Sequence, residues 1–184
     1  MAVKPASPDF VFPKSYFFPP FFSPQPTLQT RQAQLRKWSF LIQKYCRHHR
    51  IFELSIIDAL DSPLFHNPTL KKRLSLEDAK EVIDYMASHD GDGRAEWLST
   101  EKASAWIWWR NPEEWANLIA AWVEETGQKG VVLTLYELVQ GEATEKQEFY
   151  GLDSRVLQKS LTILVRKGKA QVFGTEDQQG VKFF

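Results

Sequence analysis

Residues 111–127 of this 184-residue chain read NPEEWANLIAAWVEETG. Asn111 can cap a helix, Pro112 suits the first helical position, and the two glutamates that follow suit the positive end of the helix dipole. Gly127 is a typical residue to end the helix. Between these signals apolar residues recur at helical spacing: Trp115, Leu118, Ile119, Trp122 and Val123. The stretch therefore predicts an amphipathic helix with one buried face.

The residues after this helix alternate between strand and helix signals. Asp153 can cap a longer helix, which Gly168 would end. The other expected elements are a short strand, a short helix and two final strands, at Val131–Thr134, Tyr136–Val139, Ala170–Phe173 and Val181–Phe184. This half of the chain thus has the order helix, strand, helix, helix, hairpin.

The preceding residues show the same order. A long helix is expected from a Thr30 cap to about His48, and Ser75 with Asp78 resembles a capping box for a later helix. The remaining elements are a β-like run, a short helix and a hairpin, at Ile51–Ser55, Ile56–Leu60, and Ala95–Leu98 with Ala105–Trp109. Residues 62–68, which contain two prolines, are expected to break the regular structure.

This repeated order is that of the winged-helix fold. The repeat is one of structural elements and not of sequence letters. We therefore expect an α+β, mainly helical chain with two tandem winged-helix domains, residues 27–110 and 111–184, preceded by a different segment at residues 1–26.

Residues 1–26 are rich in proline and aromatic residues. They contain seven of the ten prolines and seven aromatic side chains. Such a density of proline favours an extended, polyproline-like path. The rings of Phe18-Pro19-Pro20-Phe21-Phe22 need a place to pack, either on their own domain or in another chain. Docking in another chain is the favoured hypothesis, and deletion of residues 1–26 is then expected to leave thermal unfolding nearly unchanged.

Composition excludes several classes of protein. Lys and Arg number 23, as do Asp and Glu, so the formal net charge is +0. No segment reaches the roughly 18 apolar residues of a membrane span, and the first residues lack the apolar core of a signal peptide. The single cysteine, Cys46, cannot form an internal disulfide. A soluble intracellular protein is expected.

Catalysis is not indicated. His48 and His49 lie at an expected helix end, and Cys46 lies near the apolar face of the same helix, where a packing role is expected. No phosphate-binding glycine loop, paired catalytic carboxylates or metal-ligand spacing is found. We expect no enzyme activity, no cofactor and no metal.

Nucleic-acid binding is the alternative function. The last helix carries four basic residues: Arg155, Lys159, Arg166 and Lys167. However, residues 1–110 have 15 basic and 12 acidic residues, and residues 111–184 have 8 and 11, which gives +3 and −3. Binding to phosphate needs a positive face, so protein contact is favoured over a DNA-binding or transcription-associated role.

Seven short segments of the chain together resemble those of a known protein family. They are Phe-Pro-Pro-Phe-Phe (18–22), Thr-Arg-Gln (30–32), Ser-Pro-Leu-Phe-His-Asn (62–67), Trp-Arg-Asn-Pro-Glu-Glu-Trp (109–115), Thr-Leu-Tyr-Glu-Leu (134–138), Glu-Phe-Tyr-Gly-Leu-Asp (148–153) and Gly-Val-Lys-Phe-Phe (180–184). In this order they resemble the smallest subunit of the ESCRT-II endosomal sorting complex. One departure is Phe22, which stands where the family motif has a tyrosine.

The resemblance implies a non-catalytic adaptor with two copies per complex, one on each of two larger winged-helix subunits. Phe18, Pro19, Pro20, Phe21 and Phe22 would contact those subunits. The second winged helix would bind the first ESCRT-III subunit through residues that the resemblance does not identify. The chain would be cytoplasmic, would reach endosomal membranes only through its partners, and would serve the sorting of ubiquitinated cargo into multivesicular bodies. Residues 1–9 have no counterpart and are expected to be disordered.

Overall fold

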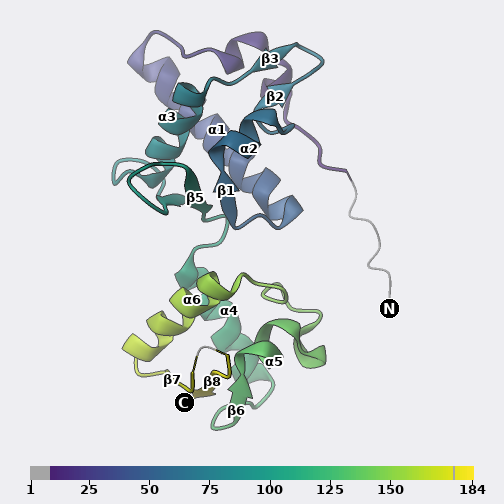
Figure 1. Ribbon diagram of the computed structural model, residues 1–184, viewed down its shortest axis with the longest axis vertical. Helices are drawn as coiled ribbons and strands as arrows, with labels where there is room; N and C mark the ends of the chain where they lie inside the picture. Colours follow the sequence, from purple (N-terminus) through teal and green to yellow (C-terminus); the bar gives the residue numbers. More distant parts are fainter. Residues whose placement is uncertain (1–8, 176) are drawn as a thin grey trace. The chain divides into compact units, whose positions relative to one another are not determined.

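The computed structural model describes residues 9–175 and 177–184, so the expectation of disorder in residues 1–9 falls almost entirely outside the described residues. The chain divides into two compact units, the first ending at Trp109 and the second spanning Arg110–Phe184. The proline- and aromatic-rich segment belongs to the first unit (Figure 1). Each unit is described below by itself.

The first unit is built of helices around a three-stranded antiparallel sheet. Its main elements are α1 (Leu28–His49), β1 (Glu53–Ser55), α2 (Ile56–Asp61), α3 (Leu76–Ala87), β4 (Ala95–Trp97) and β5 (Ser104–Ile107). The sheet order is β1-β5-β4, with Leu54 opposite Ala105 in the register. The helix, strand, helix, helix, hairpin order predicted from the sequence is thus present.

The second unit repeats this arrangement. It contains α4 (Pro112–Glu125), β6 (Val132–Thr134), α5 (Leu135–Gln140), a 3₁₀ turn η3 (Glu142–Thr144), α6 (Ser154–Arg166), β7 (Ala170–Phe173) and β8 (Gly180–Phe183). The sheet order β6-β8-β7 has the same topology as the sheet of the first unit. The α+β class and the two tandem winged helices are therefore confirmed.

Capping side chains fix where the helices begin. The Asn111 side chain accepts a hydrogen bond from the Glu114 amide while the Glu114 carboxylate accepts one from the Asn111 amide, a complete capping box. Ser75 caps α3 as predicted. The predicted start of α1 at Thr30 is wrong, because Thr27 caps the helix and its side-chain oxygen accepts from the Thr30 amide.

A small hairpin lies where the sequence predicts only irregular structure. It pairs β2 (His66–Asn67) with β3 (Lys72–Arg73). Two-residue strands carry no alternating pattern that a sequence reading could detect. The loop is nevertheless well packed, since Leu64 and Phe65 before the hairpin are fully buried.

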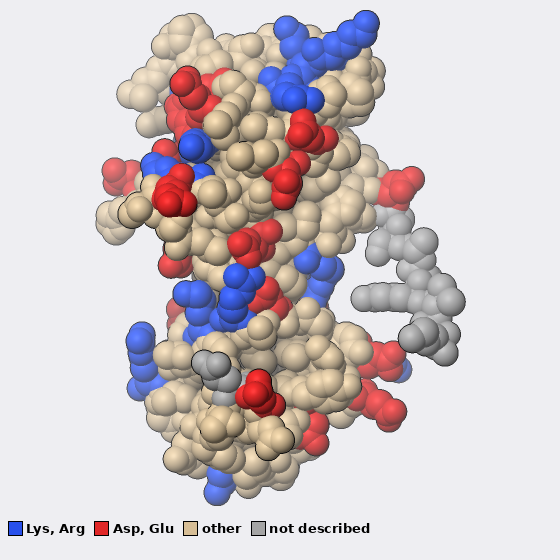
Figure 2. Space-filling model, viewed as in Figure 1, with Lys and Arg blue, Asp and Glu red and all other residues tan. Residues whose placement is uncertain are grey.

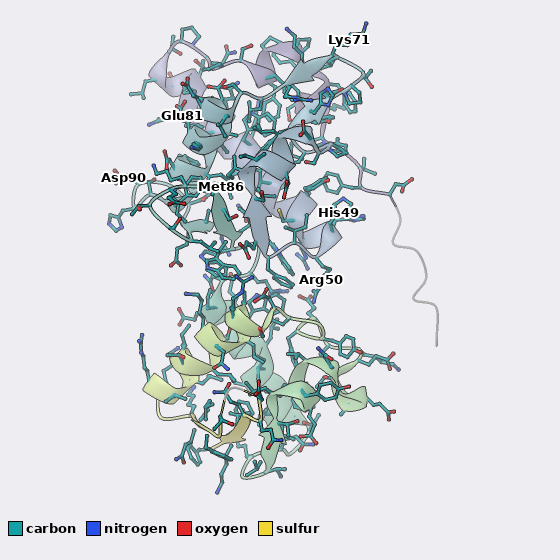
Figure 3. The ribbon with its side chains drawn as sticks, viewed as in Figure 1. His49, Arg50, Lys71, Glu81, Met86 and Asp90 are labelled. Carbon is teal, nitrogen blue, oxygen red and sulfur yellow. The ribbon has the colours of Figure 1, made fainter. Side chains whose placement is uncertain are left out.

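The core of the first unit forms on one face of α1. The side chains predicted for this face are all buried: Leu35, Trp38, Leu41, Ile42 and Tyr45. Across the unit, Arg31 of α1 pairs with Glu81 of α3 at 2.8 Å, and Figure 3 labels Glu81 on that helix together with Met86, which is fully buried. The α1 helix therefore serves as the platform on which the rest of the first unit packs.

Candidate functional site: the proline–aromatic strip

The segment before α1 does not follow the extended path predicted from its prolines. It forms two 3₁₀ turns, η1 (Lys14–Phe17) and η2 (Pro19–Phe22). Proline is compatible with the start of such a turn, because its fixed φ suits the turn and its missing N–H is not needed there. The Phe21 amide donates to the Phe18 carbonyl at 2.9 Å and closes η2. We call residues 9–26 the strip.

The two last aromatic rings of the strip are buried in the first unit. Phe21 and Phe22 are each 4% exposed. Phe21 stacks on the Trp38 indole with ring centroids 4.1 Å apart, and Phe22 meets the same indole edge-on at 5.4 Å. Both rings therefore belong to the core of their own unit.

Polar groups of α1 hold the backbone of the strip. The Gln34 amide nitrogen donates to the carbonyls of Phe21 and Ser23, at 2.9 and 2.8 Å. The Trp38 indole N–H also donates to the Phe21 carbonyl, at 3.0 Å. A buried carbonyl without a donor is costly, so these bonds are what allow a short turn to sit on an apolar helix face.

The beginning of the strip is anchored on the β2 hairpin. The Tyr16 hydroxyl donates to the Pro63 carbonyl at 2.5 Å, and the Asn67 side-chain amide donates to the Tyr16 carbonyl at 2.9 Å. Burial, with a smaller contribution from Tyr45, raises the pKa of Tyr16 to about 12. Phe12 stacks on the Tyr16 ring at 4.0 Å. The strip is thus fixed at both ends.

The opposite side of the strip faces solvent. Phe18 is 61% exposed, Phe17 is 51% exposed, and Pro19 and Pro20 are exposed as well. Of the five residues expected at a partner contact, the structure leaves Phe18, Pro19 and Pro20 on the surface and places Phe21 and Phe22 inside. Of the two alternatives for the rings, packing on their own domain holds for Phe21, because Trp38 and Gln34 offer its ring and its carbonyl a site within the chain.

The residues that hold the strip were not found in the sequence reading. Gln34 precedes Trp38 by one helical turn and so lies on the buried face of α1. A polar side chain at that position is a sign that something other than water must satisfy it. The place of Gln34 on the buried face can be read from the sequence. The carbonyls that it binds cannot, because they lie 11 to 14 residues earlier in the chain.

The other residues considered for catalysis, Cys46, His48 and His49, pack against side chains of the first unit. Cys46 is fully buried, and burial raises the pKa of its thiol to about 12. His48 and His49 end α1 as predicted, next to Arg50 (Figure 3), and the ring of Phe10 contacts both. Burial, and then His48, lower the pKa of His49. Within residues 9–175 and 177–184, no three His, Cys, Asp or Glu side chains are placed to hold a metal ion.

Two of the four basic residues named on the last helix are paired with acidic side chains. Arg155 pairs with Asp153 at 3.1 Å and Lys167 pairs with Glu113 at 3.0 Å. On the face shown in Figure 2, the first unit carries a group of basic side chains at its upper end and both acidic and basic side chains below it. These pairings weaken the nucleic-acid alternative.

The second unit carries an exposed apolar face of its own. Val132 of β6 and Phe173 of β7 are 53% and 40% exposed. Both lie over Gly180 of the intervening strand, where an added Cβ would lie 3.2 Å from Phe173 and 3.4 Å from Val132. We call these three residues the sheet patch.

The helices of the described residues differ from membrane-spanning helices in length or hydrophobicity. None combines the length and the hydrophobicity that crossing a membrane demands. The most exposed large apolar side chains lie on the strip, α1, α2 and α5: Val11, Leu28, Ile57 and Tyr136.

Comparisons with known proteins agree with this architecture. The family model described as "ESCRT-II complex subunit" matches residues 15–153. The chain is 43% identical over 175 residues to vacuolar protein-sorting-associated protein 25 of Danio rerio, covering 95% of this chain and 99% of the relative. The Homo sapiens protein of that name is also 43% identical over 175 residues, with 95% and 98% covered.

Solved structures match over nearly the same length. The crystal structure of subunit VPS25 of the endosomal trafficking complex ESCRT-II superposes with a TM-score of 0.81 at 26% identity, covering 94% of this chain and 98% of that chain. A chain in the crystal structure of the endosomal complex ESCRT-II (VPS22/VPS25/VPS36) gives 0.80 at 27% identity, with 93% and 98% covered. Two winged helices, the aromatic strip and these similarities lead to one conclusion: the chain belongs to the family of ESCRT-II complex subunits.

Proposed function

We propose that the chain is a non-catalytic adaptor subunit of an ESCRT-II complex that sorts ubiquitinated cargo into multivesicular bodies. Its partners would be two larger winged-helix subunits that correspond to VPS22 and VPS36 of the solved complex. Two copies of the chain are expected in each complex. The chain would be recruited to endosomal membranes from the cytoplasm through these partners.

One observation carries the docking part of the proposal. Phe18, Pro19 and Pro20 form an exposed apolar ridge. The Gln34 side-chain amide donates to the Pro20 carbonyl, and Gln34 and Trp38 both donate to the adjoining Phe21 carbonyl, so the end of the ridge is held on α1. Exposed aromatic side chains in a rigid setting are typical of interface anchors. Phe21 and Phe22 would contribute indirectly, by holding the ridge in place.

The test compares a variant of the ridge with a variant at another exposed apolar side chain. Phe18→Ala with Pro19→Ala is expected to abolish co-purification with the two larger subunits, while Ile57→Ala, which removes another exposed side chain of the first unit, should assemble normally. Mass measurement of the wild-type complex should give two copies. Normal assembly of the Phe18 and Pro19 variant would overturn the docking proposal.

The second unit is proposed to recruit the first ESCRT-III subunit. The sheet patch supports this role, because an exposed apolar surface on a small domain is typical of a protein contact. In the full-length chain, Val132→Ser with Phe173→Ser is expected to weaken binding to that ESCRT-III subunit at least tenfold. Val165→Ser, at a side chain of α6 that is 41% exposed, is the matched control. Equal binding by the patch variant and the control would remove the sheet patch as the contact.

A further inference from the structure

A continuous groove runs between the strip and α1 in the first unit. It consists of three adjoining hollows of about 260, 440 and 160 Å³. The first two share Ser15, Ala33 and Lys37, and the last two share Pro13 and Phe40. Along α1 the lining extends from Thr30 to Lys44, which corresponds to about 21 Å of helix. A groove of this length accommodates about six residues of extended chain.

The walls of the groove carry large apolar side chains that remain exposed among the described residues. Phe40 is 56% exposed, Phe18 is 61% exposed and Val11 is 85% exposed. Phe40 and Val11 lie in the same hollow, although they are far apart in the sequence. Large apolar side chains gathered around a concave surface favour a bound chain over free solvent.

The groove is also basic. Its lining includes Arg36, Lys37 and Lys44, and it includes no Asp or Glu among the described residues. The Lys44 ammonium lies over the Phe40 ring, 4.4 Å from its centroid. The positive charge therefore lies next to the apolar surface that a bound chain would contact.

The sequence around the groove also has an excess of basic over acidic residues. Residues 9–50, which comprise the strip and α1, contain seven Lys or Arg and one Asp, a net charge of +6. The whole chain has a formal net charge of +0. Charge is thus segregated within the chain, and the groove lies in a part with a net positive charge.

From these observations we infer that the groove binds an acidic segment with apolar side chains from one of the larger ESCRT-II subunits. The inference rests on the proposed docking function and names the chemistry of the partner at that surface. Apolar side chains of the segment would fill the hollows beside Phe18 and Phe40. Its carboxylates would meet Lys37 and Lys44, which steers association and sets the register.

A protein segment fits this surface better than an anionic bilayer does. A bilayer is a broad surface that needs protruding apolar side chains, as on an interfacial amphipathic helix. Here Phe18 and Phe40 line concave hollows between the strip and α1. The concave shape therefore favours a single chain as the occupant.

Charge reversal tests the inference in the full chain. Lys37→Glu with Lys44→Glu should weaken binding to the purified larger subunits about tenfold or more and flatten its dependence on salt, measured by calorimetry at low and high salt. The matched control, Lys146→Glu with Lys159→Glu, changes two exposed lysines of the second unit and the same net charge. It should bind as the wild type does, and urea unfolding should show that both variants are folded.

Cross-linking then identifies the bound segment. A photo-crosslinking amino acid in place of Phe40 should capture a segment of a larger subunit in which Asp and Glu outnumber Lys and Arg. Capture of a neutral or basic segment, or no capture within an assembled complex, would overturn the inference. Two results with the Lys37 and Lys44 variant would also overturn the inference. One is wild-type affinity for the larger subunits, and the other is loss of binding to phosphatidylserine vesicles while binding to the subunits is unchanged.

The outcomes separate the inference from the proposed function. If Phe18→Ala with Pro19→Ala abolishes assembly while Lys37→Glu with Lys44→Glu leaves affinity and salt dependence unchanged, the inference alone fails. If the Phe18 and Pro19 variant assembles normally, the proposed docking function fails as well.

Discussion

The ring of Phe21 lies flat on the indole of Trp38, with an interplanar angle of 9° and a centroid separation of 4.1 Å. Phe21 comes from the strip and Trp38 from the middle of α1, 17 residues later. The same indole donates its N–H to the Phe21 carbonyl. One residue of the helix thus binds both the side chain and the backbone of the strip.

Truncation of Phe21 should therefore destabilise the first unit. Phe21→Ala removes a buried aromatic side chain and is expected to lower the free energy of unfolding by about 3–5 kcal/mol. Phe17→Ala, at a ring that is 51% exposed, should cost less than about 1 kcal/mol. Urea unfolding followed by tryptophan fluorescence measures both. Equal stability of the two variants would mean that the strip contributes nothing to the core.

Loss of the Gln34 amide should have a smaller effect with a different cause. Gln34→Leu keeps the apolar contacts of the side chain but leaves the carbonyls of Phe21 and Ser23 with fewer donors. A cost of about 1–3 kcal/mol is expected. Gln32→Leu, at an exposed position of the same helix, is the control. Hydrogen exchange at the amides of residues 21–23 should accelerate only in the Gln34 variant.

The thiol of Cys46 should be unreactive in the folded protein. It is fully buried, and its pKa of about 12 leaves almost no thiolate near neutral pH. Alkylation by iodoacetamide should therefore proceed at the rate of opening of the first unit, and it should become fast in urea. Rapid alkylation under native conditions would show that α1 opens independently of its neighbours.

The carboxylate of Asp153 should add a pH dependence to the stability of the second unit. Burial raises its pKa, but the hydrogen bonds and charge of Arg155 outweigh this effect, so the pKa lies below its ordinary value of 3.8. A lowered pKa in the folded state stabilises the fold fully above the ordinary value, and this contribution is lost as the pH falls below it.

The matching variant is Asp153→Asn, which keeps a capping oxygen without the charge. Between about pH 5 and about pH 3 the wild type should lose more stability than this variant, measured by thermal unfolding at each pH. An identical pH dependence of the two proteins would contradict the effect.

The parts of the fold that depend on local signals could be predicted from the sequence. Asn111 and Glu114 lie three residues apart, and the side chain of each accepts a hydrogen bond from the backbone amide of the other. The start of α4 is therefore determined by residues close together in the sequence. Two threonines, Thr27 and Thr30, compete for the start of α1, and the first of them caps the helix. The main helices and the three-stranded sheets of both units follow from such signals and from apolar spacing, whereas the β2–β3 hairpin does not.

The position of the strip depended on contacts that no local pattern contains. Proline density predicts an extended chain, and the path was in fact decided by Gln34, Trp38 and Asn67, which lie 11 to 51 residues further along. Each donates to a strip carbonyl, so the turn was stabilised by donors outside it. The exposed part of the candidate site, Phe18 to Pro20, could be named from the sequence, but the burial of Phe21 and Phe22 could not.

The clamping of the strip by Gln34 and Trp38 has a thermodynamic consequence for recognition. A floppy proline-rich tail loses its conformational freedom when it meets a partner, which weakens the complex. Here that freedom is already lost when the polypeptide folds, so a binding protein encounters a preorganised shape. Two copies of the chain would accordingly offer identical templates, and any difference in how tightly each is held must originate in the proteins that receive them.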